Sequence, residues 1–395
     1  MDIQKIRADF PILKDVIYLD SASTSLTPEP VLDAVLDYYR GYKANVGRGV
    51  YRIAQLADQR YREAHRKVAG FVKGENGAVV FTRNTTESIN IVARGLDWRK
   101  GDKVVTTLLE HHSNFLPWLR LKKEGVKLEV IKPNPQGLLS LSDFERTIDR
   151  ETKLVAVSQL SNALGTVLPI KEISNICNDR GAALLVDAAQ SVPHMPLCVE
   201  DIDCDFFCFS GHKMLGPTGT GVLWLKNPEQ IEPLMSGGGM VDDVYDSYYD
   251  IKKGFEGFEA GTPNISGGIG LGAAVDYLNR VGVEEIHNHE KMLTKKLLNG
   301  LQEMDGVEVY GPMALNERGG LVSFNVSNLL PHEVAMMLDQ ASNIMVRSGH
   351  HCCIPLMKHM GLKYGTVRAS LYLYNSTEEI ELLLGALEQI VKMVR

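Results

Sequence analysis

Cysteine is scarce in this chain, and long apolar runs are missing. The six cysteines among 395 residues lack the density and regular spacing of a disulfide framework, which suits a reducing compartment. No apolar run approaches the roughly 20 residues of a membrane span, and the start, MDIQKIRADFPIL, carries acidic residues where a signal peptide has a basic stretch followed by an apolar one. We therefore expect a cytoplasmic protein with no membrane partner. Four cysteines fall on or beside apolar patterns and are predicted to be buried packing residues, namely Cys177, Cys198, Cys204 and Cys208.

The charge balance excludes another class of partner. Lys and Arg number 42 against 49 Asp and Glu, a net charge of −7, and no basic block is present that could follow the phosphates of a nucleic acid. We therefore expect no nucleic-acid partner. The hydrophobic fraction of 44% and the charged fraction of 23% are ordinary for a globular protein, and the length allows a large domain with a smaller one.

Seven short runs typical of β-strands recur between helical patterns. Most are continuously apolar rather than alternating, as expected for strands buried on both faces. The stretches between them include PIKEISNICNDRG, which has Pro at its start and Gly at its end, as a helix often does. This alternation predicts an α/β fold with a mostly parallel seven-stranded sheet. The runs cover residues 78–82, 103–108, 127–131, 153–158, 183–187, 205–210 and 221–226.

The pattern changes after Thr262. Two long helical patterns, 264–280 and 283–304, are followed by two or three short strands and a closing helix, TEEIELLLGALEQIVKMV. We expect a smaller α+β domain of residues 1–15 and 277–395 beside a large domain of residues 16–276. The glycine-rich stretch 236–264 is predicted to be a long irregular segment, and such segments in compact domains are often functional.

Polar residues follow most of the predicted strands, where ligands bind in open α/β sheets. Thr85 and Thr86 lie in a turn entering a helix, where free N–H groups and hydroxyls can hold a phosphate. Asp187 and Lys213 each follow an apolar strand, and His111 follows another. Each residue alone has an ordinary structural role, such as a helix cap. Together they are the parts that pyridoxal phosphate requires: an amine for a Schiff base, an acid for the ring nitrogen, a flat ring and a phosphate cup.

Longer motifs resemble those of a known family. DAAQS followed by FSGHKMLGPTGTGVLW resembles the cofactor region of the class V aminotransferases, and RSGHHC resembles the group II, SufS-like cysteine desulfurases among them. The likeness covers nearly the whole chain, with YLDSASTSLTP, FTRNTTESINIVARGL, LEHHSNFLPW, LSNALGTVLPI, FEAGTPN and VRASLYLYN in the family's order.

The resemblance implies a fold and a function. The fold is pyridoxal-phosphate fold type I, which is aspartate-aminotransferase-like. The function is that of a homodimeric enzyme, with its active site at the interface, that uses pyridoxal 5′-phosphate to convert L-cysteine to L-alanine. The sulfur would be left as an enzyme persulfide, for iron–sulfur cluster assembly or another protein acceptor.

The resemblance also assigns roles to residues of this chain. Lys213 would bind the cofactor as a Schiff base and move the Cα proton, Asp187 would pair with the pyridinium nitrogen, and His111 would stack on the ring. Cys352 matches the nucleophile that accepts sulfur, and Arg368 matches the arginine that binds the substrate carboxylate. The other implied residues are Thr85, Thr86, Gln190, Ser210 and His212 for the cofactor, Thr262 for the cofactor of a neighbouring subunit, and Asn162 and Arg347 for the substrate.

The stretch RSGHHCCIP, residues 347–355, also has other interpretations. Four consecutive residues cannot easily place all their donors around one tetrahedral zinc ion, so we expect no metal site. A purely structural thiol at Cys352 is the other alternative. Because thiolate is the attacking form, a nucleophilic Cys352 would need help from neighbours such as His350, His351 or Arg347.

Two positions depart from the family pattern. Gly47 stands where a histidine is common, so a contact to the substrate or across the dimer is expected to be missing. Cys353 follows the nucleophile where a small unreactive residue is usual. A disulfide between adjacent cysteines would be strained, and we expect Cys353 to assist persulfide handling modestly or to expose the site to oxidation.

Two other functions stay open. One is a selenocysteine lyase, or a cysteine-sulfinate or cyst(e)ine C–S lyase, that uses the same cofactor. The other is a catalytically silent scaffold that binds sulfur-transfer proteins, against which the joint presence of Lys213, Asp187, His111 and Arg368 argues.

Overall fold

The computed structural model describes residues 1–394, and a seven-stranded sheet forms its centre. The strand order is β2-β8-β7-β6-β5-β3-β4, with β8 antiparallel to both of its neighbours and the other pairs parallel. The predicted α/β fold with a mostly parallel sheet is confirmed. The strands are β2 (Ala78–Thr82), β3 (Lys103–Thr107), β4 (Lys127–Ile131), β5 (Thr152–Ser158), β6 (Ala183–Asp187), β7 (Phe206–Ser210) and β8 (Gly221–Leu225).

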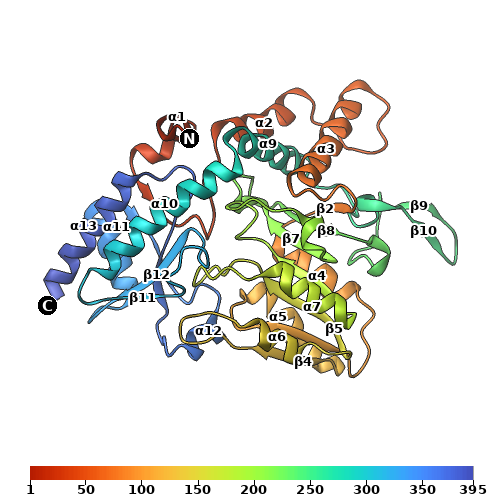
Figure 1. The fold of residues 1–395 in the computed structure, drawn as a ribbon. Helices are drawn as coiled ribbons and strands as arrows, with labels where there is room; N and C mark the ends of the chain where they lie inside the picture. Colours follow the sequence, from red (N-terminus) through yellow and green to blue (C-terminus); the bar gives the residue numbers. More distant parts are fainter. Residues whose placement is uncertain (395) are drawn as a thin grey trace.

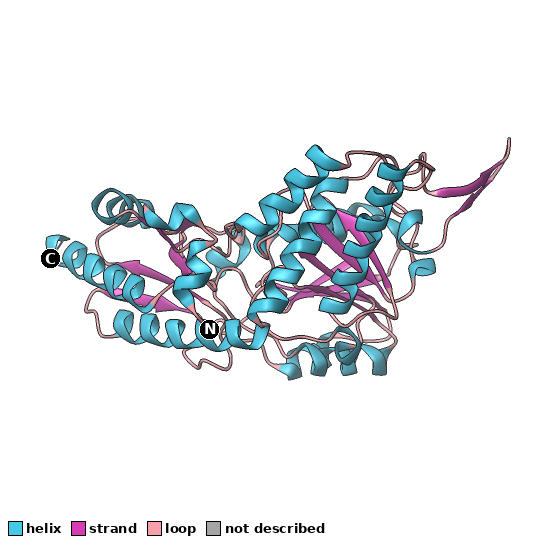
Figure 2. Ribbon diagram, turned by 90° about the horizontal axis from the view of Figure 1, so that it is seen from above, coloured by secondary structure: helices cyan, strands magenta, loops and turns pink. Residues whose placement is uncertain are grey.

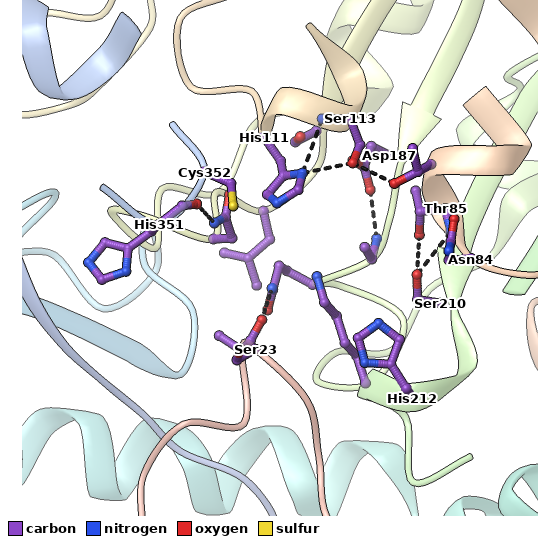
Figure 3. Close-up of a pocket in the computed structure, with 18 of the residues that line it drawn as sticks. Ser23, Asn84, Thr85, His111, Ser113, Asp187, Ser210, His212, His351 and Cys352 are labelled. Carbon is purple, nitrogen blue, oxygen red and sulfur yellow. Dashed lines mark hydrogen bonds between the residues drawn. The ribbon is translucent and has the colours of Figure 1, made fainter. Parts of the chain in front are cut away.

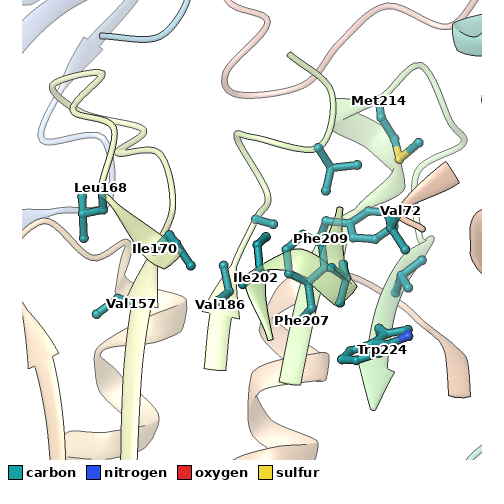
Figure 4. Packing of buried hydrophobic residues seen from close by; sticks show 14 of the residues in the cluster. Val72, Val157, Leu168, Ile170, Val186, Ile202, Phe207, Phe209, Met214 and Trp224 are labelled. Atoms are coloured by element: carbon teal, nitrogen blue, oxygen red, sulfur yellow. The ribbon is translucent and has the colours of Figure 1, made fainter. Parts of the chain in front are cut away.

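Both faces of the five inner strands of this sheet are buried, and successive side chains of a strand point to opposite sides. In β5, Val155 and Val157 belong to one apolar core, whereas Leu154 belongs to the other. Phe207 and Phe209 of β7 likewise point into the first core (Figure 4). The strands are therefore continuous apolar runs, and each large side chain buried in this way stabilises the fold by roughly 1.5–3 kcal/mol.

Helices cover the sheet on both sides (Figures 1 and 2). The predicted helix after residue 169 is α7, which ends at Gly181, whose φ of 72° closes the helix in the left-handed region. The helices of this part are α2 (Glu29–Gly41), α3 (Arg52–Phe71), α4 (Thr85–Gly95), α5 (Leu116–Leu121), α6 (Leu141–Thr147), α7 (Ile170–Arg180), α8 (Val199–Ile202) and α9 (Ile265–Val281).

A second lobe is built on a four-stranded antiparallel sheet of order β11-β12-β15-β14 (Figure 2). It has an apolar core of its own, formed with three long helices. The sequence predicted two or three strands here, and β14 is additional because Arg347–Gly349 has no apolar pattern and is defined by its pairing with β15. The elements are α10 (Val283–Gln302), β11 (Val307–Tyr310), β12 (Leu321–Val326), α11 (Pro331–Ser342), β14 (Arg347–Gly349), α12 (Ile354–His359), β15 (Thr366–Ser370) and α13 (Thr377–Val394).

The N-terminal segment runs between the two lobes. After α1 (Ile3–Ala8), Phe10 packs edge-on against Tyr277 and Tyr374. The short strand β1 (Ile17–Tyr18) then pairs with β13 (Ile344–Met345) of the second lobe. The residues that follow β1 therefore enter the space between the two sheets.

The stretch 236–264 is not irregular throughout, as the sequence had led us to expect. It contains an antiparallel hairpin of β9 (Val241–Val244) and β10 (Tyr249–Ile251), which extends away from the large sheet (Figure 1). The valines and tyrosines of the hairpin favour strands, but most of its side chains are exposed. It therefore lacks the buried apolar run that marks the strands of the core.

Two predictions from the sequence, the burial of four cysteines and the lack of a membrane span, can be compared with the structure. Cys177, Cys204 and Cys208 are buried as expected, whereas Cys198, at the start of α8, is only partly buried. Of the helices that the structure describes, none is both long enough and apolar enough to cross a membrane.

Candidate active site

A cavity of about 210 Å³ opens at the carboxyl ends of the parallel strands (Figure 3). The loops after β2, β3, β5, β6 and β7 line one side, and residues of the second lobe line the other. All residues that the sequence assigned to a site, except Thr262, line this cavity. They are Thr85, Thr86, His111, Asn162, Asp187, Gln190, Ser210, His212, Lys213, Arg347, Cys352 and Arg368.

The turn between β2 and α4 forms an anion cradle. Asn84 caps α4 by accepting the Glu87 N–H at 3.0 Å. Ser210 holds the turn from the end of β7, because its Oγ accepts the Thr85 N–H at 2.9 Å and lies 2.6 Å from Thr85 Oγ1. Gly221 permits this close approach, since a Cβ there would lie 2.5 Å from Asn84 Cα. Two of the first N–H groups of α4, those of Thr85 and Glu87, are taken by Ser210 and Asn84, so an anion here would be bound by the Thr86 N–H, the hydroxyls of Thr85 and Thr86, and the positive end of the helix dipole.

His111 is fixed by Ser113 after the end of β3. Its Nδ1 accepts the Ser113 backbone N–H at 3.1 Å, so the ring proton lies on Nε2. Ser113 Oγ lies 2.9 Å from this Nδ1 and 2.6 Å from Thr86 Oγ1, which links the ring to the cradle. Burial, together with the charge of Lys213, lowers the pKa of His111 to about 3. The ring is therefore neutral near pH 7.

Glu110 anchors the same turn, and the sequence did not reveal it. Its carboxylate accepts hydrogen bonds from the hydroxyls of Thr107 at 2.7 Å and Ser158 at 2.6 Å, and from the Asn114 amide at 2.6 Å. Burial raises the pKa of Glu110 to about 7. These contacts join β3 and β5 to the turn that carries His111. Because Ser158 lies 48 positions away along the chain, no local pattern marks the interaction.

Asp187 is the last residue of β6 and Lys213 follows β7, and these two strands are paired in parallel. Asp187 is 5% exposed and accepts the Ala189 N–H at 3.0 Å, and burial raises its pKa above the usual range. Burial lowers the pKa of Lys213 to about 8 against the opposing attraction of Asp187. About a tenth of this amine is therefore neutral at pH 7, far more than for an ordinary lysine, which favours nucleophilic attack.

Two other predicted residues contact the N-terminal segment. Gln190 donates from Nε2 to the Ala22 carbonyl at 2.7 Å, and His212 Nδ1 lies 3.2 Å from Thr24 Oγ1. Burial lowers the pKa of His212 to about 4, so this ring offers hydrogen bonds rather than a full positive charge. The segment after β1 thus closes this side of the cavity.

Two arginines lie opposite each other on the second lobe. Arg347 of β14 and Arg368 of β15 are direct cross-strand partners. Arg368 is 1% exposed and donates to Asp20 Oδ1 at 2.9 Å and to the Asn162 carbonyl at 2.8 Å. Arg347 donates to Ser23 Oγ, and Arg368 Nε is buried without a partner in the described structure. Like charges opposite each other repel, so the pair favours a bound anion.

Cys352 lies on a turn with an unusual backbone. His351 and Cys352 have φ of 50° and 58°, in the left-handed region. The His351 ring points away from Cys352 toward Thr366 Oγ1, at 2.9 Å, and burial lowers its pKa to about 2 (Figure 3). His351 is therefore neutral and offers no positive charge to a Cys352 thiolate. Arg347 lines the same cavity and is a permanent cation.

The four residues 350–353 point to different partners. His350 Nε2 lies 3.0 Å from the Lys363 carbonyl, and the Cys353 thiol donates to Asn162 Oδ1 at 3.3 Å. Cys353 is 0% exposed and burial raises its pKa, so exposure of the site to oxidation through this thiol does not fit the structure. Within residues 1–394, no group of three or more His, Cys, Asp and Glu side chains is arranged to hold a metal ion.

Thr262 is the predicted residue that lies elsewhere. It lines a second cavity of about 350 Å³ together with Gly47, and its Oγ1 is 3.4 Å from Asn45 Nδ2. Gly47 has a φ of 91°, a conformation that a histidine would rarely adopt. Glycine therefore suits the backbone conformation that this chain has at this position.

Most of the chain matches a known family. Residues 17–383 match the model described as aminotransferase class-V, and the chain belongs to this family. Full-length relatives carry the more specific name "probable cysteine desulfurase". The protein from Methanothermobacter thermautotrophicus is 49% identical over 100% of this chain and 99% of its own length. The protein from Pyrococcus abyssi is 48% identical over 99% of this chain and 98% of its own.

Solved structures agree with these relatives. The apo structure of a cysteine desulfurase from Thermococcus onnurineus NA1 has a TM-score of 0.96 at 48% identity, covering 99% of this chain and 98% of that one. The cysteine desulfurase CsdA from Escherichia coli has a TM-score of 0.92 at 31% identity and covers 100% of both chains. The fold class expected from the sequence motifs is therefore confirmed over the whole chain.

Proposed function

We propose that this chain is a pyridoxal-phosphate-dependent cysteine desulfurase that converts L-cysteine to L-alanine and takes the sulfur onto Cys352. One observation carries the proposal: Lys213, Asp187 and Cys352 line a single cavity of about 210 Å³. Each of the three groups serves a different part of this reaction. The full-length relatives named cysteine desulfurase support L-cysteine as the substrate.

The residues present fit the cofactor. Its phosphate would be held at the start of α4 by Thr85, Thr86 and Ser210. Asp187 has a raised pKa because it is buried, and a protonated ring nitrogen would be the cation that keeps it ionised. The neutral ring of His111 offers a flat surface for stacking. When bound, the cofactor supplies an electron-withdrawing ring that stabilises the electron pair left when a proton leaves the substrate Cα.

Lys213 would hold the cofactor and handle this proton. Its pKa of about 8 would make the neutral amine available to hold the cofactor covalently and to accept the Cα proton of the substrate. The positive charges of Arg368 and Arg347 also favour the neutral form of the amine. The same arginines would bind the substrate carboxylate, which places the Cα between them and Lys213.

Cys352 would then remove the sulfur. Its thiolate Sγ attacks the thiol sulfur of the substrate, a new S–S bond forms, and the substrate Cβ–S bond breaks. The electron pair of the broken bond stays with the three-carbon product, which takes up protons and leaves as alanine. The reaction balances as cysteine plus an enzyme thiol giving alanine plus an enzyme persulfide, so no outside oxidant is required.

The remaining parts of the proposal concern partners. A homodimer would bring Thr262 of the partner subunit to the phosphate, since Thr262 lies outside the cavity of its own chain. The lobes would correspond to a large domain of residues 16–276 and a small domain of residues 1–15 and 277–395. The persulfide would pass to a protein acceptor, such as one that serves iron–sulfur cluster assembly, as in group II enzymes.

Mass spectrometry after incubation with L-cysteine tests the function. We expect one added sulfur on the peptide that contains Cys352, with alanine in the solution, and neither the adduct nor cysteine-dependent turnover in Cys352→Ala. Alanine without the adduct would contradict persulfide chemistry and favour a lyase. Protein that stays colourless after addition of pyridoxal phosphate would contradict the cofactor.

A further inference from the structure

The turn that carries Cys352 is strained. In the Cys352 turn, defined as residues 349–354, Gly349, His351 and Cys352 have positive φ of 109°, 50° and 58°. The left-handed region costs a non-glycine residue roughly 1–2 kcal/mol. Such conformations persist only where the surroundings fix them. Contacts from outside the turn therefore decide where Cys352 Sγ lies.

His112 makes two of these contacts, one with Cys352 itself and one with Ile354. Its backbone N–H donates to the Cys352 carbonyl at 2.8 Å. Its ring Nε2 accepts the backbone N–H of Ile354 at 3.1 Å, so the ring is neutral and carries its proton on Nδ1. Ile354 is the first residue of α12, and this N–H has no partner within the helix. The ring thus ties the end of the turn to the loop after β3.

Asn162 holds the turn from another direction. Its Nδ2 donates to the His351 carbonyl at 2.8 Å, and its Oδ1 accepts the Cys353 thiol at 3.3 Å. The two contacts together fix the orientation of the amide. The Asn162 carbonyl also accepts Arg368 at 2.8 Å, which links the turn to the arginine pair.

We propose that His112 is a positioning residue for Cys352: by holding the Ile354 N–H, its ring keeps the strained turn in the conformation that presents Sγ to the cavity. Cys353 is a second positioning residue, which acts through Asn162. Neither His112 nor Cys353 lines the cavity, so both act through the backbone of the turn rather than on the reacting atoms. The inference rests on the proposed function, because position matters only if Cys352 is the nucleophile.

Two substitutions of His112 separate the effect of the hydrogen-bond acceptor on its ring from the effect of the volume of the ring. His112→Gln puts an oxygen near the place of Nε2 and retains the acceptor, whereas His112→Leu fills the space without one. The loss of one such contact corresponds to about a tenfold change in rate. We expect His112→Leu to lower kcat about tenfold with little change in KM for L-cysteine or in cofactor absorbance, and His112→Gln to stay within about twofold of the wild type.

His359 offers a matched control, because it lies on the same helix, α12, as Ile354. His359 Nε2 is 3.0 Å from the Pro133 carbonyl, away from Cys352, so His359→Leu removes a ring contact of α12 without touching the turn. We expect wild-type kcat in His359→Leu. Wild-type kcat in His112→Leu, or an equal loss in His112→Gln and His112→Leu, would overturn the role of the acceptor.

Hydrogen exchange at the Ile354 amide gives a readout that does not depend on turnover. We expect faster exchange in His112→Leu and wild-type protection in His112→Gln. If the wild type forms no persulfide while exchange follows this pattern, the proposed function fails and the anchoring contact stands. If the wild type forms persulfide but His112→Leu keeps both its kcat and its Ile354 protection, the positioning role fails.

Cys353 is tested by a second pair of variants. Cys353→Ser retains a donor for Asn162, whereas Cys353→Ala removes it. Because a thiol is a weak donor, we expect only about a threefold loss of kcat in Cys353→Ala and a smaller loss in Cys353→Ser. Unchanged kcat in Cys353→Ala would remove Cys353 from the proposal and leave the test of His112 as it is.

Discussion

Arg368 and Asp20 form an ion pair at 2.9 Å, with side chains 2% and 23% exposed. Asp20 follows β1 and Arg368 belongs to β15, so the pair fixes the buried guanidinium relative to the N-terminal segment. The contact uses one nitrogen of Arg368 and leaves Nε free. Removing one partner of a buried pair leaves the other charge without compensation, which typically costs about 3–5 kcal/mol.

Substitution of Asp20 tests whether this pair orients the arginine for a substrate carboxylate. We expect Asp20→Ala to raise KM for L-cysteine about tenfold, with a smaller change in kcat, because the guanidinium loses the group that holds it. Asp20→Asn retains a hydrogen-bond acceptor and should show a smaller effect. Steady-state kinetics measure both variants, with thermal unfolding as a check on the fold. An unchanged KM in Asp20→Ala would contradict this role.

The lowered pKa of Lys213 predicts the pH dependence of cofactor loading. Only the neutral amine attacks the cofactor carbonyl. Its pKa of about 8 means that the neutral fraction rises about tenfold per pH unit below pH 8 and levels off above it. We expect the loading rate of apoprotein, followed by absorbance, to rise up to about pH 8 and then to level off. A rate that keeps rising to about pH 10 would indicate an amine with an ordinary pKa.

Glu110 should make stability depend on pH. Its pKa is raised from 4.5 to about 7 in the folded chain, so the folded state holds this proton more tightly than the unfolded state does. The stabilisation is therefore present below about pH 4.5 and is lost as the pH rises through 7. The effect amounts to about 3 kcal/mol at most.

The reference variant for this test is Glu110→Gln. Its side chain cannot ionise, and its amide oxygen can still accept some of the hydrogen bonds that Glu110 accepts. We expect the midpoint of thermal unfolding of the wild type to fall relative to that of Glu110→Gln between about pH 5 and pH 8. A constant difference between the two proteins over this range would mean that Glu110 titrates normally.

The position of Thr262 outside its own cavity can be tested by mixing variants. Lys213→Ala and Thr262→Ala should each have low activity. If Thr262 acts across a dimer, a heterodimer of the two has one intact site, so an equal mixture that exchanges subunits recovers about a quarter of the wild-type activity. No recovery in mixtures shown to contain heterodimers would mean that Thr262 does not act across subunits.

Much of the large lobe could be predicted from the sequence. The runs 183–187 and 205–210 correspond to β6 and β7 to within one residue, because strands buried on both faces leave no polar position inside them. Polar residues at or shortly after the ends of such strands had to meet, since parallel strands end at the same edge of the sheet. Asp187 and Lys213 were found in this way.

Other parts had no local signal. The strand β14 is a polar tripeptide, and the hairpin of β9 and β10 is exposed, so neither has an apolar pattern. Asp20 is 348 positions from Arg368, and His112 is 242 positions from Ile354. The local sequence around a histidine or an aspartate does not reveal whether such a distant partner exists.

The sequence by itself determined the order of strands and helices along the chain and the chemistry available at the strand ends. Only the tertiary structure decided that His351 is neutral, that Cys353 is enclosed, and that Cys352 lies on a left-handed turn beside two opposed arginines. Burial and charge at one side chain depend on the groups that distant segments bring to it, and a backbone conformation unfavourable in isolation persists because those segments supply its hydrogen bonds.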